Sequence, residues 1–239
     1  MNYLLNIICG VVILAALYVG YLLLNRKLVN RRLDRELGIV TGGIRSWGRG
    51  SCHNRTESTQ YLALNSFADN YKMSSDDSLV DFGAGKGRVI IFIHDRFKIS
   101  VTGIELHEIS YGEAIDNVNS YLGNCFQNGN SSKRRYKTGK KLTIEKGYAE
   151  EYRIKEKDNK FFFFNPFDVD TFKLVVANII ESSDRYNKEV DIILYYPLSC
   201  YVEFLINETG FVLVDEIKYI GSIGSKDRFQ IYRLTPQTQ

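Results

Sequence analysis

A glycine-rich stretch between two apolar runs constrains this chain more than any other feature. Residues 79–93 read LVDFGAGKGRVIIFI, with glycines at positions 83, 85 and 87. Glycine accepts positive φ angles and allows close approach of the backbone to a ligand, because it has no Cβ. The pattern predicts a strand that ends near Asp81, a tight loop, and a helix that begins at Arg88. In open α/β sheets, a loop in this position is where nucleotides bind.

The spacing of the glycines restricts the choice of nucleotide. The dinucleotide fingerprint G-x-G-x-x-G would need a glycine where Arg88 stands, and no G-x-x-x-x-G-K-[ST] loop is present. The pattern D-x-G-x-G-x-G resembles motif I of the class I S-adenosylmethionine (SAM)-dependent methyltransferases. In that family the loop holds the methionine and ribose part of SAM, and the leading acid faces its ammonium group. The resemblance implies a cofactor-binding role for Asp81, Gly83, Ala84, Gly85 and Gly87. A flexible surface loop is the alternative interpretation.

Strand-like and helix-like segments alternate along the rest of the chain. We expect strands at 78–81, 99–105, 142–146, 161–164, 191–196, 211–219 and 228–234, and helices at 58–71, 88–95, 109–121, 169–180 and 199–208. A terminal hairpin after five parallel-type strands matches the architecture that the resemblance implies. The predicted fold is therefore α/β: a Rossmann-like, doubly wound, mostly parallel seven-stranded sheet with a C-terminal antiparallel hairpin. The methyltransferase domain is predicted to cover 55–239.

Residues at the ends of the second and third predicted strands also correspond to cofactor contacts of the family. Glu105 ends the second predicted strand, where a carboxylate can accept hydrogen bonds from both ribose hydroxyls. A solvated charge at the strand end is the alternative. The resemblance places Leu106 against the adenine. After the third strand, Tyr148 and Ala149 stand where the family often has Asp-Ala, so Tyr148 replaces the residue that reaches the adenine amino group, and Glu150 or a backbone group is the substitute.

The run FFFFNPFD at 161–168 carries the second motif. Four aromatic residues are typical of a strand buried on both faces, and the proline ends it. Asn165, Pro166 and Phe167 resemble motif IV of the amino-group methyltransferases, [DNS]-P-P-[FYW], with one proline missing. The resemblance implies that Asn165 and a main-chain carbonyl accept hydrogen bonds from a target amine, and that the aromatic residue stacks on a planar substrate. A strand terminator followed by an aromatic core residue is the alternative.

The N-terminal stretch of residues 3–24 contains no charged residue. A helix of that length spans roughly 33 Å, enough to cross a bilayer. No basic residue precedes it and no cleavage site follows, so we expect an uncleaved transmembrane anchor over 1–25. The basic residues of 26–35 then place the following domain in the cytoplasm. Residues 26–54 are predicted to form a basic juxtamembrane segment and linker, and 26–35 could also contact anionic lipid.

The charged residues, cysteines and histidines restrict which partners and metals we expect. A formal net charge of +3 does not favour nucleic acid as a partner. The four cysteines and three histidines are scattered, so we expect no metal site. Residues 133–141 hold six basic residues, which suit either a solvated loop or a contact with anionic lipid.

These observations together predict a membrane-anchored SAM-dependent methyltransferase, with an amine nitrogen favoured as acceptor. A protein lysine or a membrane-associated substrate would fit such an acceptor. The first alternative is a catalytically inactive protein that binds SAM or another nucleotide and serves as a membrane-tethered partner. The second is a Rossmann oxidoreductase, which the position of the third glycine disfavours.

Overall fold

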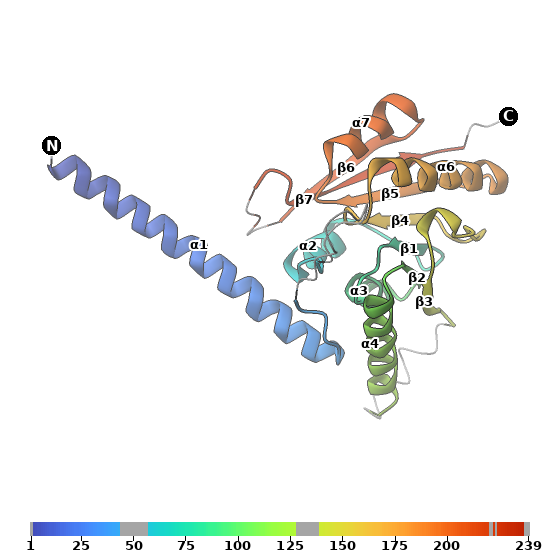
Figure 1. Cartoon of the computed structure of the whole chain (residues 1–239), viewed down its shortest axis with the longest axis horizontal. Coiled ribbons are helices and arrows are strands. Elements are labelled where there is room, and N and C mark those ends of the chain that lie inside the picture. The colour runs from blue at the N-terminus through green and yellow to red at the C-terminus, as the bar shows by residue number, and fades with distance from the viewer. Residues whose placement is uncertain (1, 44–56, 128–138, 220–221, 223, 237–239) are drawn as a thin grey trace.

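The structure, a computed structural model, describes residues 2–43, 57–127, 139–219, 222 and 224–236. A seven-stranded sheet with the order β3-β2-β1-β4-β5-β7-β6 forms its centre. The first five strands run parallel, and β7 is antiparallel to both β5 and β6. This confirms the predicted fold, including the C-terminal hairpin (Figure 1).

Strands and helices alternate along the chain as the pattern predicts. The strands are β1 (Ser78–Phe82), β2 (Ser100–Glu105), β3 (Leu142–Lys146), β4 (Lys160–Phe163), β5 (Val190–Tyr195), β6 (Val212–Lys218) and β7 (Arg228–Leu234). The helices are α1 (Asn2–Leu37), α2 (Tyr61–Asn70), α3 (Arg88–Phe97), α4 (Glu108–Gln127), α6 (Val169–Tyr186) and α7 (Ser199–Glu208), with a short 3₁₀ turn at Ala149–Glu151. The sheet grows outward from β1 first through β2 and β3 and then, on the other side, through β4 and β5. The point between β1 and β4 where this direction changes is where α/β sheets of this kind bind ligands.

Alternate residues of the central strands divide the core into two layers. Leu79 and Phe162 pack with α2 and α3 on one face, whereas Val80, Phe161 and Phe163 pack with α6 and α7 on the other. Successive strand side chains point to opposite faces, and both faces here are covered, so most side chains of these strands are apolar. The core therefore fixes the carboxyl ends of β1, β2 and β4 next to one another.

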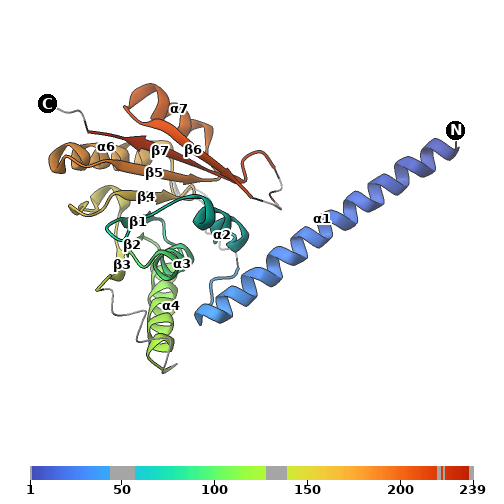
Figure 2. The same ribbon diagram turned by 180° about the vertical axis from the view of Figure 1, so that it is seen from behind.

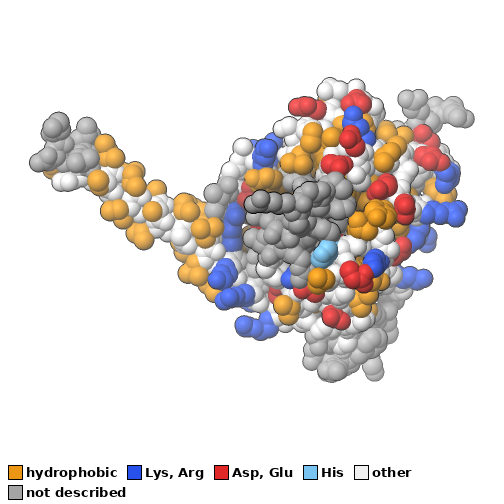
Figure 3. Space-filling model, viewed as in Figure 1, with side chains coloured by type: hydrophobic (Ala, Val, Ile, Leu, Met, Phe, Trp, Pro, Cys, Tyr) orange, Lys and Arg blue, Asp and Glu red, His pale blue; other side chains and the backbone are white. Residues whose placement is uncertain are grey.

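Helix α1 extends away from the sheet (Figures 1 and 2). It is long and apolar enough to cross a membrane: its most apolar 18-residue window has a mean hydropathy of 2.7 and none of that window is buried. The helix also continues to Leu37, so residues 26–37, which the sequence analysis includes in a linker, are helical. In Figure 3 apolar side chains line the projecting part, and basic side chains gather where it meets the domain.

A buried ion-pair cluster joins β4, β5 and β7. The Asp191 carboxylate lies 2.9 Å from Lys160 Nζ and accepts hydrogen bonds of 2.7 and 2.9 Å from Arg233 and a further one from the Tyr71 hydroxyl. Asp191 itself is fully buried. Burial favours its neutral form, but the hydrogen bonds from Arg233 and Tyr71 and the Lys160 charge outweigh burial and hold the pKa of Asp191 below its usual value.

Replacing Asp191 with asparagine should destabilise the fold by about 3–5 kcal/mol, because Lys160 would be left as a buried, unpaired charge. Urea unfolding of the full chain in mild detergent at pH 7 measures this. The pKa is lowered on folding, so the stabilisation is present above about pH 4 and is lost as the pH falls through the folded-state value. A loss below about 1 kcal/mol at pH 7, the value of an exposed pair, would contradict the assignment.

Candidate active site

The glycine-rich loop has the backbone conformation that its sequence requires. Gly83, Gly85 and Gly87 have φ angles of 81°, 55° and 83°, all in the left-handed region. A Cβ on Gly83 would lie 2.4 Å from the Cβ of Pro166, so no larger residue fits there. The loop after β1 is thereby packed directly against the end of β4, and the two sequence motifs lie side by side.

Two carboxyl groups lie beneath this loop. Asp81 and Glu105 are 3% and 5% exposed. Glu105 accepts hydrogen bonds from the backbone N–H of Gly85 (2.7 Å) and of His107 (2.8 Å), which fix its position under the loop. Burial, and then the negative charge of Glu105, raise the pKa of Asp81 well above its usual range. Two buried acids in one place favour a ligand that carries positive charge.

A cavity, here named the loop cavity, opens above these acids. Asp81, Gly83, Glu105, Asn165 and Pro166 all contribute to its lining. The hydroxyl of Thr59, also on its wall, is buried without a hydrogen-bond partner among the residues that the structure describes. Ala84, the remaining loop residue predicted to touch the cofactor, lines it as well. Buried polar groups are normally paired, so Thr59 is available to a ligand.

The residues predicted to surround the adenine line a second cavity on the other side of Pro166. This β3-side cavity is formed by Leu106, Tyr148, Ala149, Glu150 and Phe167, among others. Tyr148 is 49% exposed, so its ring stands at the mouth of the cavity. Glu150 lies in the same wall, so its carboxylate is near the place of the Asp that the family often has at position 148.

The three motif IV residues have different surroundings. Asn165 adopts a left-handed φ of 46°, and its amide nitrogen donates to the carbonyl of Tyr196 (2.9 Å). Phe167 is buried, packs edge-on against Phe163 and its carbonyl accepts a hydrogen bond from Tyr201. Asn165 therefore faces the cavities, whereas Phe167 is mainly a core residue at the base of the β3-side cavity. The burial of Phe167 does not favour the prediction that its ring stacks on a substrate.

A third cavity, the hairpin-side cavity, adjoins Asn165 on the side of β5. Phe164, Asn165, Tyr196 and Asp227 contribute to it, and so does Arg26 from α1. Asp227 accepts hydrogen bonds from Tyr195 (2.7 Å), Tyr219 and Arg26 (2.8 Å). The loop cavity and the hairpin-side cavity share Phe164 and Asn165, so a group on one side of Asn165 can meet a group on the other.

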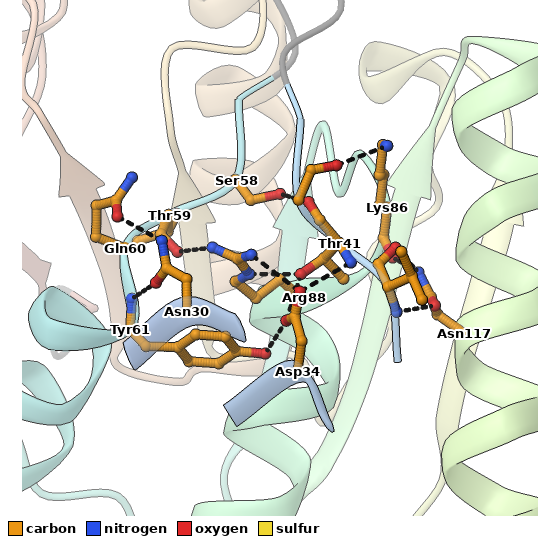
Figure 4. A network of polar contacts seen from close by, with 12 residues as sticks. Asn30, Asp34, Thr41, Ser58, Thr59, Gln60, Tyr61, Lys86, Arg88 and Asn117 are labelled. Atoms are coloured by element: carbon orange, nitrogen blue, oxygen red, sulfur yellow. Dashed lines mark hydrogen bonds and ion pairs between the residues drawn. The ribbon is translucent and has the colours of Figure 1, made fainter. Parts of the chain in front are cut away.

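A network around Arg88, which the sequence analysis did not identify, joins the end of α1 to this site (Figure 4). The guanidinium of Arg88 donates to Thr41 Oγ1 (2.6 Å) and to the carbonyl of Thr59 (3.0 Å), and it lies 3.4 Å from the carboxylate of Asp34. Asp34 also accepts from the Tyr61 hydroxyl (2.8 Å). Arg88 is only 3% exposed. In the sequence, the local signal for such a buried contact is that Arg88 directly precedes the apolar run of residues 89–93.

The loop is also tied to the segment after α1. Lys86 Nζ donates to the Gly42 carbonyl (3.0 Å) and lies 3.4 Å from Glu113. Asn117 bonds to both backbone groups of Val40 and donates to the Lys86 carbonyl (2.9 Å). Lys86 is thereby held toward α4, unlike the lysine of a phosphate-binding loop.

Two sequence expectations concern other parts of the chain. Most of the basic run 133–141 lies outside the described residues, which include only its last three positions. No group of three or more metal-ligating side chains occurs in the part of the chain that the structure describes.

Comparison with solved structures identifies the fold. A Clostridium thermocellum protein described as a putative rRNA methylase matches with a TM-score of 0.50 and 12% identity, over 74% of this chain and 97% of its own. The pyocyanin biosynthetic protein PhzM matches with a TM-score of 0.51 and 15% identity, over 72% of this chain and 54% of its own. An RNA methyltransferase from Salinibacter ruber, solved with S-adenosylhomocysteine (SAH), matches with a TM-score of 0.46 and 14% identity, over 77% of this chain and 96% of its own.

No family model and no curated protein matches the sequence. At 12% and 15% identity, the two matches with TM-scores of 0.50 and 0.51 establish the fold alone. The chain therefore has the seven-stranded fold of the SAM-dependent methyltransferases.

Replacing Asp81 with asparagine should stabilise the free protein at pH 7. The folded-state pKa of Asp81 is raised, so folding loses stability as the pH rises from about 4 toward that value, and a neutral side chain removes the loss. Thermal unfolding in mild detergent measures the change, which is opposite in sign to that expected for Asp191→Asn. An Asp81→Asn variant that unfolds at a lower temperature than the wild type would contradict the description of the site.

Proposed function

We propose that this protein is a SAM-dependent methyltransferase, with an amine nitrogen favoured as the methyl acceptor. The observation that carries the proposal is the pair of buried acids, Asp81 and Glu105, beneath a loop of three left-handed glycines. SAM carries an ammonium and a sulfonium group, which suit this negative site. A dinucleotide would instead bring its anionic pyrophosphate to the loop, next to Asp81.

The described residues support specific roles toward SAM. Asp81 would face the ammonium group. The Glu105 carboxylate would accept hydrogen bonds from the ribose hydroxyls, since each of its oxygens can accept more than one. The adenine would lie in the β3-side cavity against Leu106, with Tyr148, Ala149 and Glu150 around its edge. The backbone of Gly83, Ala84, Gly85 and Gly87 would follow the methionine part.

Bound SAM supplies an already activated methyl group, so the protein has to orient the acceptor and exclude water. Asn165 lies on the wall shared by the loop cavity and the hairpin-side cavity. Its amide oxygen would accept a hydrogen bond from an acceptor amine in the hairpin-side cavity and direct the nitrogen lone pair toward the methyl group. The Tyr196 carbonyl fixes the other end of the amide.

The same proposal places the protein on a membrane. Residues 3–24 of α1 would cross the bilayer, and the basic residues that follow would keep the domain in the cytoplasm, where SAM is made. The basic segment 26–35 would then lie at the surface of anionic lipid. This supports a protein lysine or a membrane-associated substrate as the acceptor.

SAM should bind the wild-type chain more tightly as the pH rises through the raised pKa of Asp81, because the ammonium group needs ionised Asp81. Binding should also release a proton to the buffer. Calorimetric titration in two buffers of different ionisation enthalpy measures both effects. Asp81→Asn should weaken binding about tenfold or more and remove the pH dependence.

Asp184→Asn, at an exposed position near the end of α6, is the matched control and should bind SAM as the wild type does. A pH dependence that persists unchanged in Asp81→Asn would contradict the role of Asp81.

Asn165→Gly should leave the SAM dissociation constant within about twofold and lower methyl transfer by roughly a hundredfold or more. Glycine suits the left-handed backbone at this position, so the variant removes the amide without straining the loop. Transfer from labelled SAM into membrane and cytosolic extracts gives the rate. Full turnover by this variant would refute the acceptor role, and SAM binding with no transfer by the wild type would favour the catalytically inactive partner protein.

A further inference from the structure

A groove, here named the helix groove, runs between the domain and the part of α1 that follows the uncharged stretch. On the α1 side, Leu23, Lys27, Arg31 and Arg35 line one edge of the groove, and Arg26, Asn30 and Asp34 line it beside them. The segments around Thr41 and Ser58 form the opposite wall. Leu23, Lys27, Arg31 and Arg35 are spaced four apart, so they lie on one side of the helix. The groove thus begins at the apolar part of α1 and is bordered by a stripe of three cations.

The three cations of this stripe are not used by the fold. Lys27, Arg31 and Arg35 are exposed, and their side chains form no ion pair or hydrogen bond with the residues that the structure describes. Two other arginines of the groove differ, because Arg26 is bound to Asp227 and Arg88 is bound to Asp34. The positive-inside rule requires basic residues near the end of a transmembrane helix but does not require them on a particular side of it. Topology alone therefore does not explain why these three basic residues line the groove.

The helix groove continues into the candidate active site. Glu57 and Ser58 line the helix groove, the loop cavity and the hairpin-side cavity. Gln60 and Arg26 are shared by the helix groove and the hairpin-side cavity. A molecule held by the stripe therefore lies beside the cavity where Asn165 would receive the acceptor.

We propose that the helix groove binds the phosphate of an anionic membrane lipid on Lys27, Arg31 and Arg35, and that the methyl acceptor is lipid-borne. This inference rests on the proposed membrane anchor and methyltransferase activity. Arginine recognises phosphate by paired, charge-assisted hydrogen bonds. A lipid fits better than the phosphates of RNA, because the groove starts at Leu23 within the stretch that would lie in the bilayer, where the acyl chains of a lipid can follow α1.

Lipid binding is tested with the full chain in dodecyl maltoside by thermal unfolding during titration. The probes are dioctanoyl phosphatidylglycerol and dioctanoylglycerol, which differ in the phosphate headgroup. Phosphatidylglycerol should raise the melting temperature saturably, and dioctanoylglycerol should not. Inorganic phosphate and a 20-nucleotide RNA are run in parallel. A stabilisation by either of them equal to that by phosphatidylglycerol would overturn the lipid assignment.

Two neighbouring arginines give a matched pair of variants. Arg31→Gln should weaken phosphatidylglycerol binding roughly fivefold, and Arg31→Gln with Arg35→Gln about twentyfold or more. Arg32→Gln removes the same charge at nearly the same depth, but Arg32 points away to Glu36 and its side chain is 69% exposed, so its affinity should be unchanged. Equal weakening by Arg31→Gln and Arg32→Gln would overturn the groove as the binding site.

SAM titration of the same variants separates this inference from the proposed function. The double variant should bind SAM as the wild type does while losing the lipid. Wild-type protein that binds the lipid but not SAM would contradict the methyltransferase proposal and leave the lipid site standing. Wild-type protein that binds SAM but shows no stabilisation by phosphatidylglycerol would overturn the lipid site alone.

Discussion

The buried guanidinium of Arg88 is the interaction on which the arrangement of this site depends. It follows Gly87 directly, so its position is fixed by the glycine-rich loop, and it reaches Asp34 on α1, Thr41 after α1 and Thr59 before α2. Its plane also stacks on Tyr61, with 4.5 Å between the guanidinium carbon and the ring centre. A buried arginine needs all of these partners, because an unpaired buried charge costs several kcal/mol.

The consequence is that α1 is part of the α/β domain as well as a candidate anchor. Asn30 accepts a hydrogen bond from the first N–H of α2, and Arg26 reaches Asp227 in the loop between β6 and β7. The C-terminal part of α1 therefore contributes Arg26 to the wall of the hairpin-side cavity beside Asn165. A membrane-embedded acceptor would reach the site along this wall, whereas a freely tethered domain would have no fixed orientation toward the bilayer.

The sequence was sufficient for the fold and for most of the candidate residues that line the loop cavity, because both depend on local patterns. The apolar strands, the glycine spacing around Gly85 and the acid at the end of β2 are each recognisable within about ten residues. The α1 contacts are not local: Asp34 meets Arg88 across 54 positions, and Arg26 meets Asp227 across 201. Basic residues after an apolar stretch indicate topology whether or not they dock. Likewise, the sequence pattern of an aromatic residue after a proline, as at Phe167, is the same whether the side chain packs in the core or contacts a substrate.

The most direct test compares two fragments that lack the apolar stretch. A fragment of residues 25–239 keeps Arg26, Asn30 and Asp34, and a fragment of 38–239 removes them. The account predicts that the longer fragment binds SAM like the full chain, whereas the shorter one melts about 10 °C lower and binds SAM more weakly, since Arg88 loses its carboxylate partner. Equal melting temperature and equal SAM affinity in the two fragments would contradict the claim that the contact between α1 and Arg88 maintains the candidate site.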